Sequence, residues 1–337
     1  MSQISIGDLS QSFQFRRQNT ALNAELNRLA EELSSGRKQD IREVLRGDTA
    51  GLASLEQGLR RIDAFDLAIK DVEIEVTARQ ATIETIRNNT QASVGSLLLD
   101  ETLGDPKLSQ SAARDAAQSF RAILGSLNGV VGNRSLFAGT ATDGLAVADD
   151  ETILAAVEAE IALAAVTTPA DVEAVVETWF APGGGYDTVG YIGGAETLSG
   201  PRLSNSEELG DAPRADDIRL RETLTGFAMG ALVDRGLFSG QAEDRSAFLG
   251  RAGERLLNAE RGLADLQGEI GLDEGRIERA RTEGEFERVT LERARNDLIG
   301  ADPFETAGQL QSIEVQIRSL YTITGRLSQL SLQSFLR

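Results

Sequence analysis

A seven-residue apolar repeat near the carboxyl end constrains the fold of this chain more than any other feature. From Leu249 to Leu298, every seventh residue is leucine or isoleucine, with a single glycine in the series. Such a repeat keeps one seam of a long helix against a partner and gives a gentle left-handed supercoil. The sequence therefore predicts a mainly α fold built on long paired helices. The seam residues assigned to this helix are Leu256, Leu263, Ile270 and Ile277.

The amino-terminal half supplies a partner for that helix. Apolar residues step by three and four from residue 51 to residue 98, which predicts one helix over this range. Shorter helices are predicted from Pro106 to Val131 and from Ile218 to Val233, each after an aspartate that can cap it. The same pattern fits the core of a monomeric bundle or a contact between subunits, and both remain open. The seam residues assigned to the first helix are Ile62, Ile69, Val72 and Val76.

Charge divides the chain into three parts. Residues 141–217 carry 2 basic and 16 acidic side chains, a net charge of −14 out of −19 for the whole chain. The flanking arms, 1–140 and 218–337, are nearly neutral, with net charges of −2 and −3. A phosphate backbone would be repelled by the middle and would find no basic stripe in the arms. We therefore expect no nucleic-acid partner.

The acidic middle also differs in its residue types. It holds the single tryptophan and four of the six prolines. A short helix is predicted after Thr168, and two short strands are predicted at Tyr186–Val189 and Tyr191–Ile192, between glycines. We therefore expect a small, exposed α+β insert at the far end of a long antiparallel coiled-coil rod, which the two arms form together.

Missing residue types exclude most catalytic chemistry. The chain has no histidine and no cysteine, which removes His- or Cys-ligated zinc, thiol nucleophiles, disulfides and imidazole triads. Gly183–Gly185 has no following lysine, so a loop is favoured over a phosphate cradle. The aspartates of the middle do not have the spacing of a calcium loop. We expect no enzyme activity, no cofactor and no metal site, and the short apolar runs predict no membrane insertion.

Both ends of the chain carry amphipathic stripes. An isolated helix of this kind is marginal in water, so the stripes must pair with one another, with other subunits, or with both. We favour burial between subunits. The expected domains are terminal assembly helices at 1–36 and 303–337, a helical rod at 37–140 and 218–302, and the acidic insert at 141–217. The predicted assembly residues are Phe15, Leu22, Leu26, Leu29, Leu33, Leu310, Ile313, Ile317, Leu320, Leu327, Leu332 and Phe335.

Three stretches of the chain resemble the bacterial flagellin superfamily. Leu33–Arg37 (LSSGR) is similar to the signature that ends the first terminal helix, and Leu327–Leu332 (LSQLSL) with Phe335–Arg337 is similar to the closing stretch. Asn133–Thr140 (NRSLFAGT) resembles a stretch of the hook–filament junction branch. Filament flagellins have an Asn-rich start and an alanine-rich terminal helix, neither of which is present here. The resemblance therefore favours the junction branch.

This resemblance implies a structural adaptor subunit that joins the flagellar hook region to the filament. Such a subunit is secreted unfolded by the flagellar export apparatus and assembles outside the cell through its terminal helices. The implied partners are further copies of the chain in a ring, a neighbouring hook-associated protein, flagellin and a flagellar export chaperone. Consistent with this route, residues 1–12 lack the basic and apolar regions of a cleavable signal. The alternatives are a filament flagellin or, less favoured, a cytoplasmic coiled-coil scaffold.

Overall fold

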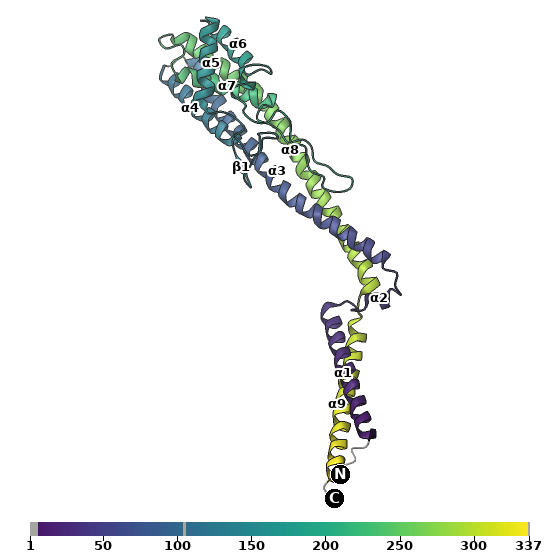
Figure 1. Cartoon of the computed structure of the whole chain (residues 1–337). Coiled ribbons are helices and arrows are strands. Elements are labelled where there is room, and N and C mark those ends of the chain that lie inside the picture. The colour runs from purple at the N-terminus through teal and green to yellow at the C-terminus, as the bar shows by residue number, and fades with distance from the viewer. Residues whose placement is uncertain (1–5, 104–105, 336–337) are drawn as a thin grey trace. The chain divides into compact units, whose positions relative to one another are not determined.

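A computed structural model gives the fold of residues 6–103 and 106–335 (Figure 1). Side chains are described for residue 10, residues 13–99 and residues 106–326. The chain divides into two units. Unit 1 comprises Met1–Asp63 and Glu285–Arg337, and unit 2 comprises Ala64–Gly284. Helices make up most of both units, which confirms the predicted mainly α class.

The helices fall close to where the apolar periodicity placed them. The helix predicted over residues 51–98 is α3, and the helix with the seven-residue repeat is α8. Two very short strands, β1 and β2, pair antiparallel as a small hairpin. The described elements are α1 (Ile6–Ser35), α2 (Ile41–Val44), α3 (Ala50–Leu103), α4 (Pro106–Leu127), β1 (Val130–Val131), β2 (Arg134–Ser135), α5 (Asp150–Ala164), α6 (Pro169–Phe180), the 3₁₀ helix η1 (Gly185–Asp187), α7 (Ile218–Asp234), α8 (Ala242–Ile299) and α9 (Pro303–Phe335).

Side-chain caps fix the start of the shorter helices. The Asp149 carboxylate accepts a hydrogen bond from the Thr152 N–H at 2.7 Å and begins α5. The Thr168 hydroxyl accepts from the Asp171 N–H at 3.3 Å, and the following proline occupies the first turn of α6. Asp217 caps α7 in the same manner. Such caps satisfy N–H groups that the helix itself leaves unpaired.

The core of unit 2 is organised around α7. This helix packs against α4, and the insert helices α5 and α6 also contact it. Phe120 of α4 and Phe227 of α7 are fully buried in one continuous cluster that also includes Trp179 of α6. A helix that is buried on nearly all sides belongs to the interior of its domain. The acidic insert therefore shares a hydrophobic core with the two arms instead of forming a core of its own.

The prediction of strands within the insert is wrong. Tyr186 lies in η1, and the only pairing of Tyr191 is an isolated bridge to Val147. The aromatic side chains that suggested strands are instead buried as packing residues. The Tyr186 hydroxyl donates to the Ala215 carbonyl at 3.1 Å, and its ring lies against Phe180. Tight turns satisfy the backbone here, so no β-ladder is required.

Unit 1 has a thinner core. Helix α1 packs against α9, while the first turns of α3 lie against the last turns of α8. A β-carbon on Gly58 of α3 would meet the Leu291 side chain of α8 at 2.8 Å, which shows how closely these two helices approach. Among the residues of unit 1 whose side chains are described, the buried apolar ones are Leu29, Leu52, Leu59, Ile62, Ile299, Ala301 and Leu320.

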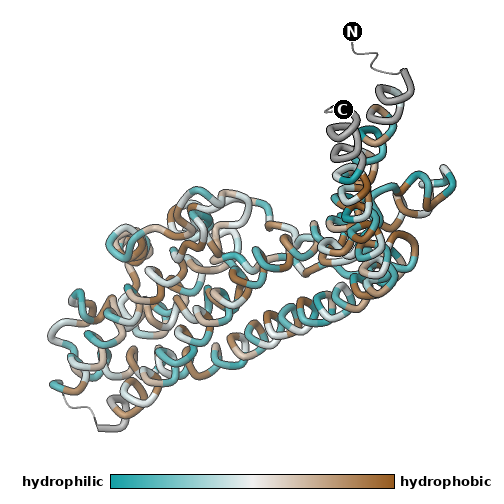
Figure 2. Tube along the Cα trace, turned by 90° about the horizontal axis from the view of Figure 1, so that it is seen from below, coloured by the Kyte–Doolittle hydropathy of each residue, from teal (hydrophilic) through white to brown (hydrophobic). Residues whose placement is uncertain are grey.

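Hydropathy varies over short distances along all the helices. Figure 2 shows polar and apolar residues interleaved along the helical tubes. Among the described residues, no helix combines the length and the apolar character that a membrane span requires. The apolar residues instead recur with helical periodicity, as packing against neighbouring helices requires.

Candidate assembly interface

The paired terminal helices α1 and α9 bring both predicted assembly stripes together (Figure 1). Helix α1 ends at Ser35, and Gly36 then adopts a left-handed conformation with φ +67°, which is the usual conformation of a glycine that ends a helix. Helix α9 begins at Pro303 after Asp302, whose carboxylate accepts the Phe304 N–H at 2.8 Å. Local caps therefore set the end of α1 and the start of α9.

The predicted assembly residues are covered to very different extents within the single chain. Leu29 and Leu320 are buried, with exposed fractions of 1% and 6%, whereas Leu33 is 40% exposed. Part of each stripe thus pairs with the other, one of the possibilities that the sequence left open. The half-buried members are Phe15, Leu22, Leu26, Leu310, Ile313 and Ile317. Leu327, Leu332 and Phe335 belong to α9 by their backbone, and their side chains lie outside the described residues.

A second set of apolar side chains points away from the α1–α9 contact. Phe304 is 91% exposed and Phe13 is 64% exposed, and Val315 lies eleven residues after Phe304, three turns further along the same face of α9. Sequence analysis selected only the continuous stripe and missed these residues. A helical projection of α9 with attention to the face opposite the stripe would have found them. These residues leave apolar surface uncovered on both α1 and α9.

A buried carboxylate holds the segment that follows α1. Glu32 is 4% exposed, accepts a hydrogen bond from the Arg28 guanidinium at 2.5 Å and accepts the Gln39 N–H at 3.0 Å. Further backbone hydrogen bonds join this segment to the residues before α9. The Lys38 N–H donates to the Ile299 carbonyl at 2.9 Å. The loop after Gly36 is thus held against the segment that connects α8 to α9.

All eight predicted seam residues are buried. In unit 2, Arg281 of α8 pairs with Glu73 of α3 at 3.3 Å, and Arg87 of α3 donates to the Gln267 side chain of α8 at 2.9 Å. The residue numbers rise along one helix as they fall along the other, so the two helices are antiparallel here. Within unit 2, the seam is therefore closed inside one chain, as a monomeric bundle requires.

The stretch Asn133–Thr140 has a structural role in unit 2. Phe137 and its neighbours are buried, and the buried Arg79 guanidinium of α3 donates to the Leu136 carbonyl at 3.2 Å. Burial lowers the pKa of Arg79, while the adjacent Glu75 carboxylate acts in the opposite direction. The Ala215 N–H donates to the Phe137 carbonyl at 2.9 Å. This stretch therefore connects the amino-terminal arm to the end of the insert.

A second buried arginine holds the insert to α7. The Arg221 guanidinium donates to the Phe180 carbonyl at 3.1 Å, contacts the Asp187 carboxylate and lies 5.0 Å from the centre of the Tyr186 ring. Burial also raises the pKa of the Tyr186 hydroxyl. Sequence analysis did not single out Arg221, because its spacing within α7 is that of an ordinary polar residue.

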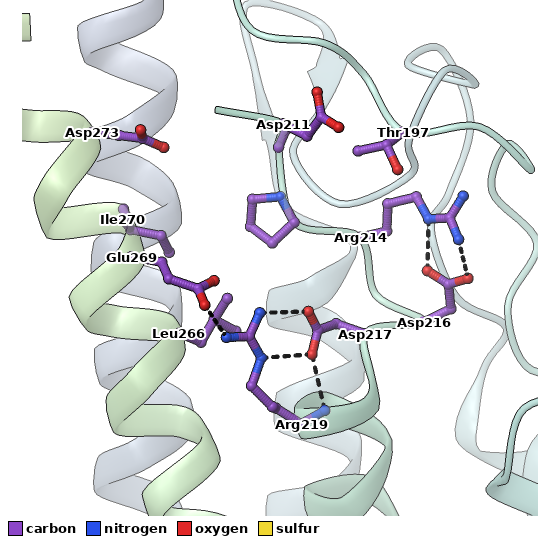
Figure 3. A pocket seen from close by; sticks show the side chains of 12 residues that line it. Thr197, Asp211, Arg214, Asp216, Asp217, Arg219, Leu266, Glu269, Ile270 and Asp273 are labelled. Atoms are coloured by element: carbon purple, nitrogen blue, oxygen red, sulfur yellow. Dashed lines mark hydrogen bonds and ion pairs between the residues drawn. The ribbon is translucent and has the colours of Figure 1, made fainter. Parts of the chain in front are cut away.

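A polar pocket lies between the last loop of the insert and α8 (Figure 3). In it, Arg219 pairs with Asp217 at 2.7 Å and with Glu269 at 2.8 Å, and Arg214 pairs with Asp216 at 2.6 Å. Burial raises the pKa of Asp217, but the hydrogen bonds from Arg219 outweigh this effect, and the pKa lies below its ordinary value. The ion pairs that line the pocket thus hold the last loop of the insert to α8.

Three carboxylates of this pocket, Asp216, Asp217 and Glu269, are engaged in ion pairs with Arg214 and Arg219. A catalytic acid–base pair needs groups whose pKa values are moved apart toward neutral pH, and Asp217 is moved in the opposite direction. Tyr191, near the same loop, has its pKa raised by burial to about 12. In the part of the chain that the structure describes, no group of three or more acidic side chains is placed to hold a metal ion.

Comparison with known proteins identifies the fold. Neither a family model nor a curated protein matches the sequence. Among solved structures, the crystal structure of Bacillus cereus FlgL matches 72% of this chain and 99% of its own, with a TM-score of 0.52 and 14% sequence identity. The two proteins share a fold. A flagellar hook-associated protein from Vibrio parahaemolyticus covers 75% of this chain and 100% of its own, with a TM-score of 0.48 and 13% identity.

Proposed function

We propose that this chain is a structural subunit of the bacterial flagellum that joins the hook region to the filament. In this role, copies of the chain form a ring between a neighbouring hook-associated protein and flagellin, and they meet through α1 and α9. The chain reaches this position unfolded, by flagellar export with a dedicated chaperone. A chain without cysteine forms no disulfide that would hinder such threading.

The fold shared with FlgL carries this proposal, because nearly the whole FlgL chain matches. Exposed apolar side chains on both terminal helices support it. Phe13, Phe304 and Val315 remain uncovered after α1 and α9 have packed on each other. Burying a large apolar side chain is worth about 1.5–3 kcal/mol, so these residues favour assembly with other subunits. The role is non-enzymatic.

The role can be tested by deleting the gene in the bacterium that encodes this chain. We expect hooks without attached filaments and flagellin released into the medium, because the adaptor between them is missing. Electron microscopy of isolated hooks and immunoblots of the medium give the two measurements. Filaments of normal length on the deletion strain would contradict the proposal. Wild-type filaments composed of this chain along their whole length would instead favour the filament flagellin.

Variants of the outward face test the assembly mechanism. Phe304→Asp together with Val315→Asp removes two exposed apolar contacts without disturbing the face of α9 that packs on α1. Each contact worth about 1.4 kcal/mol lowers affinity about tenfold, so we expect few filaments and secreted, unassembled subunit. The matched control is Leu163→Asp on the insert helix α5, where the leucine is 79% exposed. Equal filament numbers in the double variant and the control would contradict assembly through this face.

A further inference from the structure

Three glycines lie within eight residues in the middle of α8. They are Gly268, Gly271 and Gly275, and the helix runs through them without a break. Of the described atoms outside the helix's own nearby backbone, none would lie within 4 Å of a β-carbon on Gly268 or Gly271. A β-carbon on Gly275 would lie 3.7 Å from the Arg279 guanidinium, an ordinary van der Waals distance. Packing therefore requires no glycine in this glycine segment, residues 268–275.

Other glycines of the same helix do serve packing. A β-carbon on Gly253 would meet the Leu98 side chain of α3 at 3.0 Å, and one on Gly262 would meet the Arg219 side chain of α7 at 3.0 Å. These two glycines let neighbouring helices approach closely. Glycine loses more backbone entropy than alanine when a helix forms, so every glycine also weakens the helix that contains it. In the glycine segment, this cost has no compensating contact.

The seam of α8 has its one polar position inside the glycine segment. The seam consists of two series that each recur every seventh residue, one from Leu249 and one from Ala252. Asp273 interrupts the second series, and its carboxylate is half-buried. A polar residue there removes an apolar contact that the neighbouring turns keep. The buried members of the two series up to residue 280 are Leu249, Ala252, Leu256, Ala259, Leu263, Leu266, Ile270, Ile277 and Ala280.

The facing part of α3 is polar as well. The antiparallel contacts between α3 and α8 bracket the glycine segment, so Arg79 and Gln80 of α3 lie at its level. The buried Arg79 guanidinium donates to the Leu136 carbonyl. The side-chain oxygen of Gln80 is buried and accepts no hydrogen bond from the described residues, which costs free energy. Apolar packing thus holds α8 less firmly here than on either side.

The last loop of the insert, residues 197–215, is attached to α8 at the same place. The Gly210 N–H donates to the Asp273 carboxylate at 3.4 Å, and Glu207 pairs with Arg279 at 3.3 Å. These contacts depend on the helical geometry of α8, because Asp273 and Arg279 lie within or just after the glycine segment. Loss of helix in this segment would therefore detach the loop.

We propose that the glycine segment is a built-in weak point of α8. It opens locally while the helix on both sides stays folded, and each opening releases the last loop of the insert. Two independent features carry this inference: glycines that no contact requires, and a polar stretch in an otherwise apolar seam. The inference does not rest on the flagellar role, because it uses only the packing of unit 2.

Amide hydrogen exchange of the purified full-length protein measures such local opening. After correction for intrinsic rates, we expect the amides of residues 268–275 to exchange at least about tenfold faster than those of residues 252–259 in the same helix. The reason is that residues 252–259 keep both the close contacts and the apolar seam. Equal protection of the two stretches would overturn the proposal.

A variant with Gly268→Ala, Gly271→Ala and Gly275→Ala tests the cause of the opening. Each alanine lowers the opening equilibrium about two- to fivefold, so exchange in residues 268–275 should slow about eightfold or more. The Gly210 amide, which exchanges when the loop is released, should slow at least about threefold. Unchanged exchange in the helix would refute the weak point, and unchanged exchange at Gly210 would refute the release of the loop.

The matched control is Gly95→Ala in α3. Gly95 is also an exposed helical glycine of unit 2, and a β-carbon there would have none of the described atoms outside its own nearby backbone within 4 Å. This variant should leave exchange in residues 268–275 within about twofold of the wild type. If it slows that exchange as much as the triple variant does, the glycine segment opens only when unit 2 unfolds as a whole, and the proposal is wrong.

Discussion

Helices α7 and α9 show how differently two helices of one chain are covered. In α7, every residue from Leu220 to Val233 except Glu222 is buried. In α9, only Thr306 and Leu320 are buried among the residues whose side chains are described. Unit 2 therefore has a large core around α7, whereas α9 of unit 1 leaves most of its surface uncovered. The comparison predicts that single substitutions affect stability far more in α7 than in α9.

The largest expected effect comes from truncating one phenylalanine in each helix. Phe227→Ala removes a fully buried ring from the core of unit 2 and should cost about 3–5 kcal/mol in the free energy of unfolding. Phe304→Ala removes an exposed ring and should change that free energy by less than about 0.5 kcal/mol. Urea unfolding of the purified monomer measures both. Similar losses for the two variants would remove the distinction between the units.

A matched pair of buried leucines sharpens the comparison. Leu29 of α1 and Leu232 of α7 are both 1% exposed. Leu232→Ala should destabilise the whole of unit 2 by about 2–5 kcal/mol. Leu29→Ala should instead accelerate hydrogen exchange in α1 and α9, with little change in the main unfolding transition, because few neighbours depend on this contact. A loss of protection in α7 upon Leu29→Ala would show that the two units unfold as one.

Substitution of a single carboxylate tests the junction after α1. Glu32→Gln keeps the shape of the side chain but weakens its bonds to Arg28 and to the Gln39 N–H. We expect a loss of about 1–2 kcal/mol in local stability, seen as faster amide exchange at Gln39 and Lys38. Glu31→Gln is the control, since Glu31 is exposed on the same turn. If amide exchange at Lys38 and Gln39 is equally fast in both variants, Glu32 does not hold this segment.

The smallest effect is expected on the stability of unit 2 at acid pH. The pKa of Asp217 lies below its ordinary value, so its contribution is complete above the ordinary pKa of about 4 and disappears as the pH falls through the folded-state pKa. Asp217→Asn should reduce the loss of unfolding free energy between neutral and acid pH by about 1 kcal/mol or less. Urea unfolding at a series of pH values measures this. The exposed Glu196→Gln should keep the wild-type profile, and a steeper profile for Asp217→Asn would contradict the sign.

The sequence predicts the helical framework because helix periodicity and caps are local. The repeat through Leu256 and Leu263 located α8, and Thr168 with the following proline located the start of α6. The strands expected near Tyr186 are absent because tertiary burial of its ring overrides local β-propensity. Periodicity shows which face of a helix is apolar, but it does not show what covers the other residues. It therefore predicts neither the burial of the polar Arg221 nor the exposure of Phe304, which lies outside the apolar stripe of α9.

The hydrogen bonds between Lys38 and Ile299, and between Ala301 and Gly36, have a consequence for chains whose translation ends early. They join residues 36–38 to residues 299–301, although more than 260 residues separate the two segments. A product that stops short of residue 299 during translation lacks the second segment and all of α9. Helix α1 therefore finds its packing partner only after α9 has been translated.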